Sequence, residues 1–398
     1  MMNKTSQILT LGAALWVAPL TATTFAQATW QTMDVFTMGQ SGAIFGMAAV
    51  GNGVVFSAGN GADATGIFYP YVRRSLDGGA NWSQMLQLPT SGLAYGVTVG
   101  QKSGLVFATA GTTDTKKAGW GNWLTLRSAD GGTTWSTVDF LSAPSGKADP
   151  YAVVEDAAGR VFVGGNLGDL NNTDHWLIRR SLDGGTTWTT VDNVAKGLNV
   201  VRGMVATPAG VFAAGYLGKP FWTVRCSNDG GNTWRTVDTV SSVPAGNFSA
   251  GGFSHAFGIA ADAAGNLYTV GDASFVVNNV VKYRWLTRKS ADGGATWRTV
   301  DEVIGDTTYA GANAVTVDKF GTVFTGGNYQ RVSGGTTNTH WSTRVSVDAG
   351  ATWATSDDLI PGIPMAAASD AVGNVYLGGK VKGPISNVSA GVRKLAAP

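Results

Sequence analysis

The sequence contains one cysteine and few charged residues among its 398 positions. A single cysteine, Cys226, cannot form an internal disulfide, so packing must supply the stability of the fold. Only 14% of the residues are charged, and lysine plus arginine number 28 against 26 for aspartate plus glutamate. The resulting net charge of +2 gives no field strong enough to gather nucleic acid or an anionic membrane surface. We therefore expect no nucleic-acid partner.

Long apolar runs are absent beyond the N-terminus. There, Lys4 precedes an apolar stretch at residues 8–20, and Ala26-Gln27-Ala28 follows it. These are the charged, apolar and small-residue parts of a secretory signal. No later stretch approaches the roughly 18 to 20 apolar residues that a helix needs to span a bilayer. The sequence predicts a signal peptide at residues 1–28, cleavage after Ala28, and a mature domain at 29–398 that is secreted or periplasmic and has no membrane span.

Glycine and tryptophan are abundant, with 56 and 14 copies, and many of them belong to a repeat. An octapeptide of the general form S-x-D-x-G-x-T-W recurs six times at nearly constant spacing. Its aspartate carboxylate can accept N–H bonds across a tight hairpin, its glycines allow positive φ, and its tryptophan anchors the next strand. We interpret the repeated aspartates as structural residues of these hairpins, and they are Asp77, Asp130, Asp183, Asp229, Asp292 and Asp348.

A second motif, a glycine turn followed by a β-rich strand, precedes each octapeptide and occurs seven times. Its copies begin at Gly53, Gly104, Gly159, Gly210, Gly265, Gly321 and Gly373. The chain ends explain the unequal numbers, because residues 29–34 match the strand after an octapeptide and residues 392–395 match the strand before it. The sequence therefore predicts an all-β, seven-bladed β-propeller whose last blade is closed by N- and C-terminal strands. An open ring would leave additional sheet edges exposed to aggregation, and joining the two ends of the chain avoids this.

The octapeptide resembles the Asp-box, or BNR, repeat. That repeat occurs in sialidases, some xyloglucan-cleaving glycoside hydrolases, sortilin-type receptors, a photosystem assembly factor and some fungal lectins. The resemblance covers essentially the whole mature chain and implies a propeller of the sialidase-like superfamily. Because these proteins span several functional classes, it implies no single activity.

The order of strands in a blade separates the repeated turns from the variable segments. The octapeptides lie on one face of the ring, so the connections of variable length lie on the opposite face, where we expect a ligand. We expect the long variable segments to be loops, at residues 111–122, 165–175, 239–256, 272–284, 301–312 and 329–340.

Twelve of the 14 tryptophans and six of the arginines occupy positions that repeat among the blades, and they are interpreted as structural. They include the tryptophans that open the third strand, Trp123, Trp176, Trp222, Trp285 and Trp341, and the arginines Arg73, Arg179, Arg225, Arg288, Arg344 and Arg393. Cys226 lies in line with Arg74, Arg127 and Arg180, so we interpret it as a strand residue and not as a nucleophile. Trp120 has no repeated counterpart, and with Lys116 and Lys117 it forms a basic-aromatic loop that could stack on a sugar ring.

Three arginines fall outside the repeat. Arg202, Arg284 and Arg331 lie in or beside the variable segments of the fourth, fifth and sixth blades. Three arginines converging on a carboxylate would resemble the arginine triad of sialidases. However, the chain has only two glutamates, Glu155 and Glu302, and no Arg-Ile-Pro motif, so the sequence supports a sialidase-like Tyr–Glu pair poorly.

The three histidines and the starts of the first strands form the other candidate site. His175 and His340 occupy the same place in the third and sixth blades, and His255 begins the first strand of the fifth. Counting back from each glycine turn places Arg202 at the same position as Tyr95, Tyr151 and Asn313. We expect these four residues and His255 to form a polar funnel, and a lyase-like His-Tyr-Arg arrangement is one use of such a funnel.

Our leading hypothesis is a secreted propeller that binds an extracellular glycan or another polar ligand on the face of the variable segments. The candidate ligand-binding residues are Trp120, Tyr95, Tyr151, Arg202, His255, Arg284, Asn313, Arg331, His175 and His340. Two alternatives remain open. One is a carbohydrate-active enzyme, either a sialidase-like glycoside hydrolase or a polysaccharide lyase, and the other is a protein-interaction scaffold for an envelope protein. We expect a monomer with no cofactor and no metal site.

Overall fold

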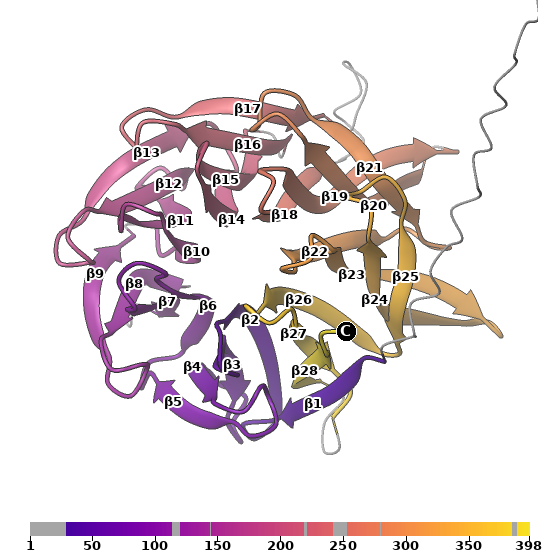
Figure 1. Cartoon of the computed structure of the whole chain (residues 1–398), viewed down its shortest axis with the longest axis horizontal. Coiled ribbons are helices and arrows are strands. Elements are labelled where there is room, and N and C mark those ends of the chain that lie inside the picture. Colours follow the sequence, from indigo (N-terminus) through magenta and orange to yellow (C-terminus); the bar gives the residue numbers. More distant parts are fainter. Residues whose placement is uncertain are drawn as a thin grey trace, which may run out of the picture.

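The computed structural model describes residues 29–113, 120–143, 145–218, 221–241, 253–278, 280–383 and 388–398. The predicted signal peptide and the pair Lys116 and Lys117 lie outside these residues. The described chain forms seven four-stranded antiparallel sheets, which stand as blades around a central axis (Figure 1). This arrangement confirms the prediction of an all-β, seven-bladed propeller. No helix in the described part of the chain is long and apolar enough to cross a membrane.

The first three blades follow one another along the chain. Blade 1 contains β2 (Ser41–Ala49), β3 (Val55–Ala62), β4 (Phe68–Ser75) and β5 (Ser83–Gln87). Blade 2 contains β6 (Gly92–Val99), β7 (Val106–Thr113), β8 (Trp120–Ser128) and β9 (Ser136–Ser142). Blade 3 contains β10 (Ala148–Glu155), β11 (Val161–Gly168), β12 (Asp174–Ser181) and β13 (Thr189–Ala195).

The next three blades repeat the same order of strands. Blade 4 contains β14 (Val200–Thr207), β15 (Gly210–Leu217), β16 (Phe221–Ser227) and β17 (Arg235–Val240). Blade 5 contains β18 (Ser254–Ala261), β19 (Leu267–Val277), β20 (Val280–Ser290) and β21 (Arg298–Ile304). Blade 6 contains β22 (Ala310–Val317), β23 (Val323–Ser333), β24 (Thr336–Ser346) and β25 (Ala354–Leu359).

Blade 7 joins the two ends of the chain, as predicted. It contains β26 (Gly362–Ser369), β27 (Val375–Val381) and β28 (Ser389–Leu395), and its outermost strand is β1 (Gln31–Phe36). The side chain of Arg393 fastens β28 to the N-terminal segment, because its Nη1 donates to Thr32 Oγ1 at 2.9 Å and its Nη2 donates to the carbonyl of Trp30 at 3.2 Å. The ring is therefore closed by hydrogen bonds between strands that lie at opposite ends of the sequence.

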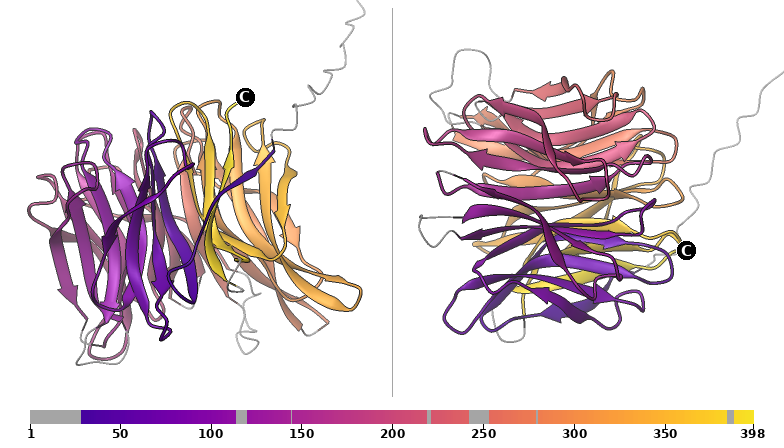
Figure 2. Two further views of the ribbon diagram at one scale, coloured as in Figure 1. Left: turned by 90° about the horizontal axis from the view of Figure 1, so that it is seen from below. Right: turned by 90° about the vertical axis from the view of Figure 1, so that its left-hand side faces the viewer.

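Two of the segments expected to be loops are strand extensions. Residues 272–284 and 329–340 belong to the β19–β20 and β23–β24 hairpins, whose strands are 11 residues long. The expectation of loops was wrong because both segments carry residues of high β propensity, such as the valines at 276, 277, 280 and 281. The two hairpins project beyond the rest of the ring (Figure 2).

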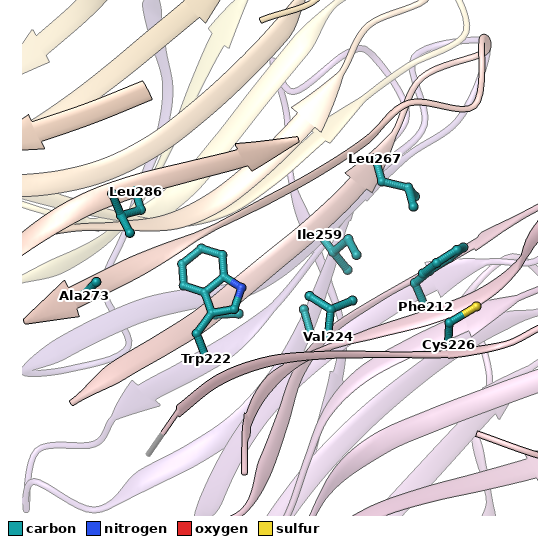
Figure 3. Close-up of a cluster of buried hydrophobic side chains, with 10 residues drawn as sticks. Phe212, Trp222, Val224, Cys226, Ile259, Leu267, Ala273 and Leu286 are labelled. Atoms are coloured by element: carbon teal, nitrogen blue, oxygen red, sulfur yellow. The ribbon is translucent and has the colours of Figure 1, made fainter. Parts of the chain in front are cut away.

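The hydrophobic core lies in the seams between neighbouring blades. In the seam between blades 4 and 5, Trp222 and Phe212 pack against Leu286 and Leu267 (Figure 3). Cys226 is buried in the same seam with 1% of its surface exposed, which agrees with its interpretation as a strand residue. The tryptophans that open the third strands are all fully buried, and Tyr71 takes their place in blade 1.

An ion pair crosses six of the seven seams. In each case, an arginine of a third strand binds an aspartate in the outermost strand of the preceding blade. Between blades 4 and 3, Arg225 donates from Nε and Nη2 to the two carboxylate oxygens of Asp192, at 2.8 and 3.0 Å. The other pairs are Arg73–Asp34, Arg179–Asp139, Arg288–Asp238, Arg344–Asp301 and Arg393–Asp357. We call these six residues the clamp arginines.

The seam between blades 1 and 2 replaces both members of the clamp with leucine. Leu126 occupies the arginine position and is buried, and Leu86 occupies the aspartate position and packs against the same apolar cluster. An apolar pair of similar size can substitute for a buried ion pair without loss of stability, whereas removal of one partner leaves an uncompensated charge. The simultaneous change of both partners is consistent with that rule.

A second cation next to the clamp position reaches the octapeptide turn of the following blade. The donors and their carbonyl acceptors are Arg74 and Gly131, Arg127 and Gly184, Arg180 and Gly230, Lys289 and Ala349, and Lys394 and Gly78. We call these contacts latches. Cys226 stands at this position in blade 4, and its thiol instead lies 2.7 Å from Oδ1 of Asn228 in its own turn.

The octapeptide turns owe their shape to the repeated aspartate. In blade 3, Asp183 Oδ1 accepts N–H bonds from Thr187 at 2.8 Å and Thr186 at 3.0 Å, and a hydroxyl bond from Ser181 at 2.8 Å. Gly185 has a φ of 87°, a region that glycine enters without steric cost. The hydrogen bonds lower the pKa of the equivalent Asp77 to about 2, with the backbone N–H of Asn81 as the main cause. The turns therefore hold ionised carboxylates over the whole physiological range of pH.

Candidate functional site in the central channel

A β-bulge in each innermost strand aims one side chain at the central axis. In β6, for example, Ala94 and Gly96 pair with adjacent residues of β7, so Tyr95 is an extra residue in its strand. A bulge of this kind bends the strand and redirects the extra side chain. The seven bulged residues are Phe45, Tyr95, Tyr151, Arg202, Phe257, Asn313 and Met365, and they line a cavity of about 170 Å³.

A small residue follows every bulge, because the innermost strands approach one another closely. A Cβ atom on Gly46 would lie 2.4 Å from the carbonyl oxygen of Tyr95 in the next blade. The bulged residues stand in the first half of their strands, nearer to the variable-segment face. Counting back from the glycine turns in the sequence had already placed four of these seven residues at one shared position, namely Tyr95, Tyr151, Arg202 and Asn313.

Five of the bulged side chains form a continuous row across blades 1 to 5. The ring centroids of Phe45 and Tyr95 are 5.9 Å apart, and those of Tyr95 and Tyr151 are 4.4 Å apart. The guanidinium carbon of Arg202 lies 3.9 Å from the centroid of Tyr151 and 6.0 Å from that of Phe257. Arg202 is thus held between two aromatic rings, an arrangement that favours a cation.

Arg202 differs from the clamp arginines in its lack of a carboxylate partner. Among the described residues it forms no ion pair within 4.0 Å, and its buried Nε atom has no hydrogen-bond partner. Its guanidinium interacts with the hydroxyl of Tyr216 through a side-chain hydrogen bond. A guanidinium that lines a cavity and has no carboxylate partner is a natural contact for a ligand oxygen.

Asp149 is an acceptor beside the tyrosine pair. It receives a hydrogen bond from the Tyr95 hydroxyl at 3.0 Å. Burial raises the pKa of Asp149, while the bond from Tyr95 and the charge of Arg202 oppose that rise. Burial also raises the pKa of Tyr95 and of Tyr151, so both tyrosines remain neutral hydrogen-bond donors at physiological pH.

His255 lies next to Phe257, on the side of Arg202 opposite to Tyr151 and Asp149. Its Nδ1 is 2.7 Å from Oδ1 of Asp272, which is almost fully buried. The His255 ring contacts that of Tyr216 at 4.8 Å and stacks on Phe257 at 5.6 Å. The structure therefore brings the expected His, Tyr and Arg side chains into one cluster, which we call the channel site.

Three residues of the channel site were not predicted from the sequence: Asp149, Tyr216 and Asp272. Asp149 stands two residues before the bulge of its blade, as His255 does in blade 5, so the same register could have identified it. Tyr216 and Asp272 lie near the ends of second strands in blades 4 and 5. No repeated motif marks these two positions, and only the packing of neighbouring blades joins them to the site.

The other candidate residues lie apart from the channel site. Among the described residues, Arg202, Arg284 and Arg331 contact different partners. Arg202 lies over Tyr151, Arg284 binds Glu302 at 3.1 Å, and Arg331 lies over Tyr329. The three arginines therefore do not form a triad. Asn313 donates to the carbonyl of Pro364 at 2.9 Å, within the ring of bulges.

The remaining histidines have partners of their own in blades 3 and 6. His175 Nδ1 lies 2.7 Å from Asn193 Oδ1, and His340 Nδ1 lies 2.7 Å from Asp358 Oδ1. Trp120 begins β8, where its backbone pairs with Thr113, and its side chain lies outside the described structure. Among the residues that the structure describes, no group of three or more histidine, cysteine or acidic side chains could hold a metal ion.

The fold and the site define a seven-bladed β-propeller with a polar and aromatic cluster in its channel. No family model and no curated protein matches the chain. A structure titled YCF48 bound to D1 peptide is similar over 94% of this chain and 98% of its own, with 16% identity and a TM-score of 0.54. The GH74 xyloglucanase of Xanthomonas campestris is similar over 88% of this chain and 53% of its own, also with 16% identity and a TM-score of 0.54. At these identities the similarity shows a common fold.

Proposed function

We propose that this protein is a secreted propeller of the Asp-box type that binds a glycan at the channel site. The observation that carries the proposal is the row of aromatic rings broken by Arg202, a guanidinium that lines the cavity and has no carboxylate partner among the described residues. A sugar ring presents C–H groups on its faces, which stack on aromatic rings, and hydroxyls around its edge. A few convergent polar groups on an aromatic lining are typical of such a site.

The acceptors of the channel site complete the requirements of a sugar. Hydroxyl groups both donate and accept, so a sugar needs carboxylate or amide oxygens as well as guanidinium and hydroxyl donors. Asp149, which is partly exposed, supplies a carboxylate acceptor on one side of Arg202. On the other side, the buried Asp272 holds Nδ1 of His255, so that Nε2 of the ring is left to face a ligand. The similarity to a xyloglucanase supports this class of ligand, whereas the similarity to a peptide-bound propeller supports the scaffold alternative.

A glycan array probed with residues 29–398 tests the proposal. We expect binding to at least one glycan, and we expect the Kd to rise at least tenfold, or about 1.4 kcal/mol, in Arg202→Met and in Tyr151→Ala. Arg298→Met is the matched control, because that arginine is exposed and begins β21 directly after an octapeptide, on the face opposite the variable segments; the affinity of this variant should not change. Trp120→Ala tests whether the basic-aromatic segment also contributes. Absence of binding to every glycan would reject the proposal.

The second candidate is a carbohydrate-active enzyme that uses the same cluster, and one specific observation favours it. When Asp272 accepts the Nδ1 proton of His255, Nε2 is left as a proton acceptor, and the ring of Tyr216, whose hydroxyl could donate a proton, is 4.8 Å from the His255 ring. Such a pair could serve as a general base and acid. Fluorogenic glycosides and the absorbance of unsaturated uronic products would detect hydrolysis and elimination. Turnover that is lost in His255→Gln while binding remains would establish this candidate.

A further inference from the structure

We infer that the ligand is an uncharged glycan chain of several sugar units, which runs from the channel site onto a wall built by blades 5 and 6. The inference rests on the proposed function. The wall consists of Tyr283 in β20, the connection at residues 305–309, and the outer ends of β23 and β24. Among the described residues of the other five blades nothing corresponds to it, because their second and third strands are only seven to nine residues long.

The wall is a rigid structure and not a pair of independent hairpins. The connection between the blades is hydrogen-bonded to both of them: Tyr283 N donates to the carbonyl of Thr308 at 2.7 Å, and Asp306 N donates to that of Gln330 at 3.0 Å. Gln330 N in turn donates to the carbonyl of Tyr309 at 3.2 Å. A surface that is ordered before binding loses little conformational entropy when a ligand docks, so it is well suited to extend a binding site.

A pair of aromatic rings connects the wall to the channel site. The rings of Tyr283 and Tyr309 are 6.0 Å apart, and both side chains are partly exposed. The hydroxyl of Tyr309 is hydrogen-bonded to Asp272, the same carboxylate that holds His255. Gly311 makes room for this contact, because a Cβ atom there would lie 2.6 Å from the Tyr309 hydroxyl oxygen. Aromatic and polar groups therefore continue without a break from the channel onto the wall.

The size of the channel cavity and the charge of the wall define the class of ligand. The cavity of about 170 Å³ is smaller than the roughly 300 Å³ at which pockets for whole small ligands begin, so it can accept only part of a chain. Along the wall, Arg284 pairs with Glu302 at 3.1 Å, and Asp306 lies next to the segment of Arg331, because its Oδ2 accepts a hydrogen bond from the backbone N–H of Val332 at 3.1 Å. A surface with no excess of either sign favours an uncharged glycan over a polyanion.

Homologous series of one to six sugar units test the inference by calorimetry, using cello-, manno-, xylo-, xyloglucan and α-1,5-arabino-oligosaccharides. We expect the affinity for one series to rise at least tenfold between the disaccharide and the hexasaccharide. Tyr283→Ala should abolish this gain and leave disaccharide binding unchanged, whereas Tyr283→Phe should retain the gain because stacking is preserved. Tyr69→Ala, at a partly exposed tyrosine of blade 1, is the matched control and should retain it as well.

The possible results separate the inference from the proposed function. Binding without a gain in affinity with length, or a gain that survives in Tyr283→Ala, rejects the wall and leaves glycan binding at the channel site intact. Absence of binding to every series rejects both. Each variant should unfold at the wild-type melting temperature, which would show that a lost increase in affinity with chain length does not come from misfolding.

Discussion

Arg225 and Arg202 lie in the same blade and show how two regions of this molecule use the same side chain. Arg225 binds both carboxylate oxygens of Asp192, and the arrangement recurs at five other seams. Arg202 stands once in the ring of bulges, between two aromatic rings, and has no carboxylate partner. The clamp region satisfies its own charges, whereas the channel site leaves donors and acceptors exposed to a ligand.

The comparison separates structural from functional residues in a repeat protein. At a position that repeats around the ring, every blade faces the same packing problem and arrives at a similar residue. At the bulged position the backbone repeats but the side chains do not: the seven blades carry two phenylalanines, two tyrosines, an arginine, an asparagine and a methionine. A position whose geometry is constant and whose chemistry varies is therefore the place to seek function.

Deletion of residues 29–36 should have the largest effect on stability. It removes β1, the buried side chain of Trp30 and the partner of the Arg73 clamp, and it leaves β28 as an unpaired edge. We expect the melting temperature to fall by at least about 10 °C, given that each kcal/mol corresponds to roughly 2–4 °C in a chain of this size. Size-exclusion chromatography should show self-association. An unchanged melting temperature in a monomer would contradict the role of β1 in closing the ring.

The two arginines themselves provide the next test. Arg225→Leu leaves Asp192 buried without a partner, so we expect a loss of about 3 kcal/mol in the free energy of unfolding. The double variant Asp192→Leu/Arg225→Leu copies the leucine pair of the seam between blades 1 and 2 and should recover to within about 1 kcal/mol of the wild type. Urea denaturation measures the free energy of unfolding of the wild type and of both variants.

Arg202→Leu is the counterpart of Arg225→Leu in the channel. Because no ion pair is broken there, its cost should stay below about 1 kcal/mol, while glycan affinity falls. A cost as large as that of Arg225→Leu would show that Arg202 is structural, and the contrast between the two regions would then collapse.

Acid should destabilise the octapeptide turns and not the channel. Hydrogen bonds lower the pKa of Asp77, Asp292 and Asp348 to about 2, from 3.8 in an unfolded chain. A lowered pKa stabilises the fold above the unfolded value, and this contribution is lost as the pH falls through the folded value. The melting temperature should therefore drop steeply between about pH 4 and pH 2, and less steeply in Asp292→Asn than in the wild type.

Asp149 provides the control for that experiment, since burial shifts its pKa upwards. A raised pKa stabilises the fold only below the unfolded value, so ionisation of Asp149 opposes folding as the pH rises through its folded pKa. Asp149→Asn should leave the acid transition of the turns in place. If it removed that transition, the assignment of acid sensitivity to the octapeptide turns would be wrong.

The sequence predicted the ring, and it predicted part of the channel site. Each octapeptide is a local hairpin whose hydrogen bonds join residues within four positions, so each copy can be recognised from its own sequence. The bulged residues could be located by counting back from the glycine turns, since they stand eight residues before the turn in six blades and nine residues before it in blade 2. Asp272 and Tyr216 could not, because their role depends on side chains of a neighbouring blade. The long hairpins of blades 5 and 6 could not be distinguished from loops by the repeat, because their outer residues have no counterpart in the other blades.

Cys226 offers the smallest and most local test of the repeat. At the same position, Arg127 and Arg180 donate to glycine carbonyls in the next blade at 2.8 and 2.7 Å. Cys226→Arg should place a guanidinium near the octapeptide turn that contains Gly293 and add about 0.5–1 kcal/mol of stability, the typical net value of one hydrogen bond. Urea denaturation measures the gain. Cys226→Ser cannot reach the next blade and should give none.

The wild-type cysteine provides an independent measurement at the same position. Burial raises the pKa of its thiol to about 11, so we expect no alkylation of the native protein by iodoacetamide at pH 8, and rapid alkylation in urea. Arginine at position 226 should also leave the channel site unaffected, with glycan affinity unchanged. A destabilised Cys226→Arg variant would mean that the seam between blades 4 and 5 is packed differently from those on either side of blade 3. The latch would then depend on the individual seam and could not be a general property of the repeat.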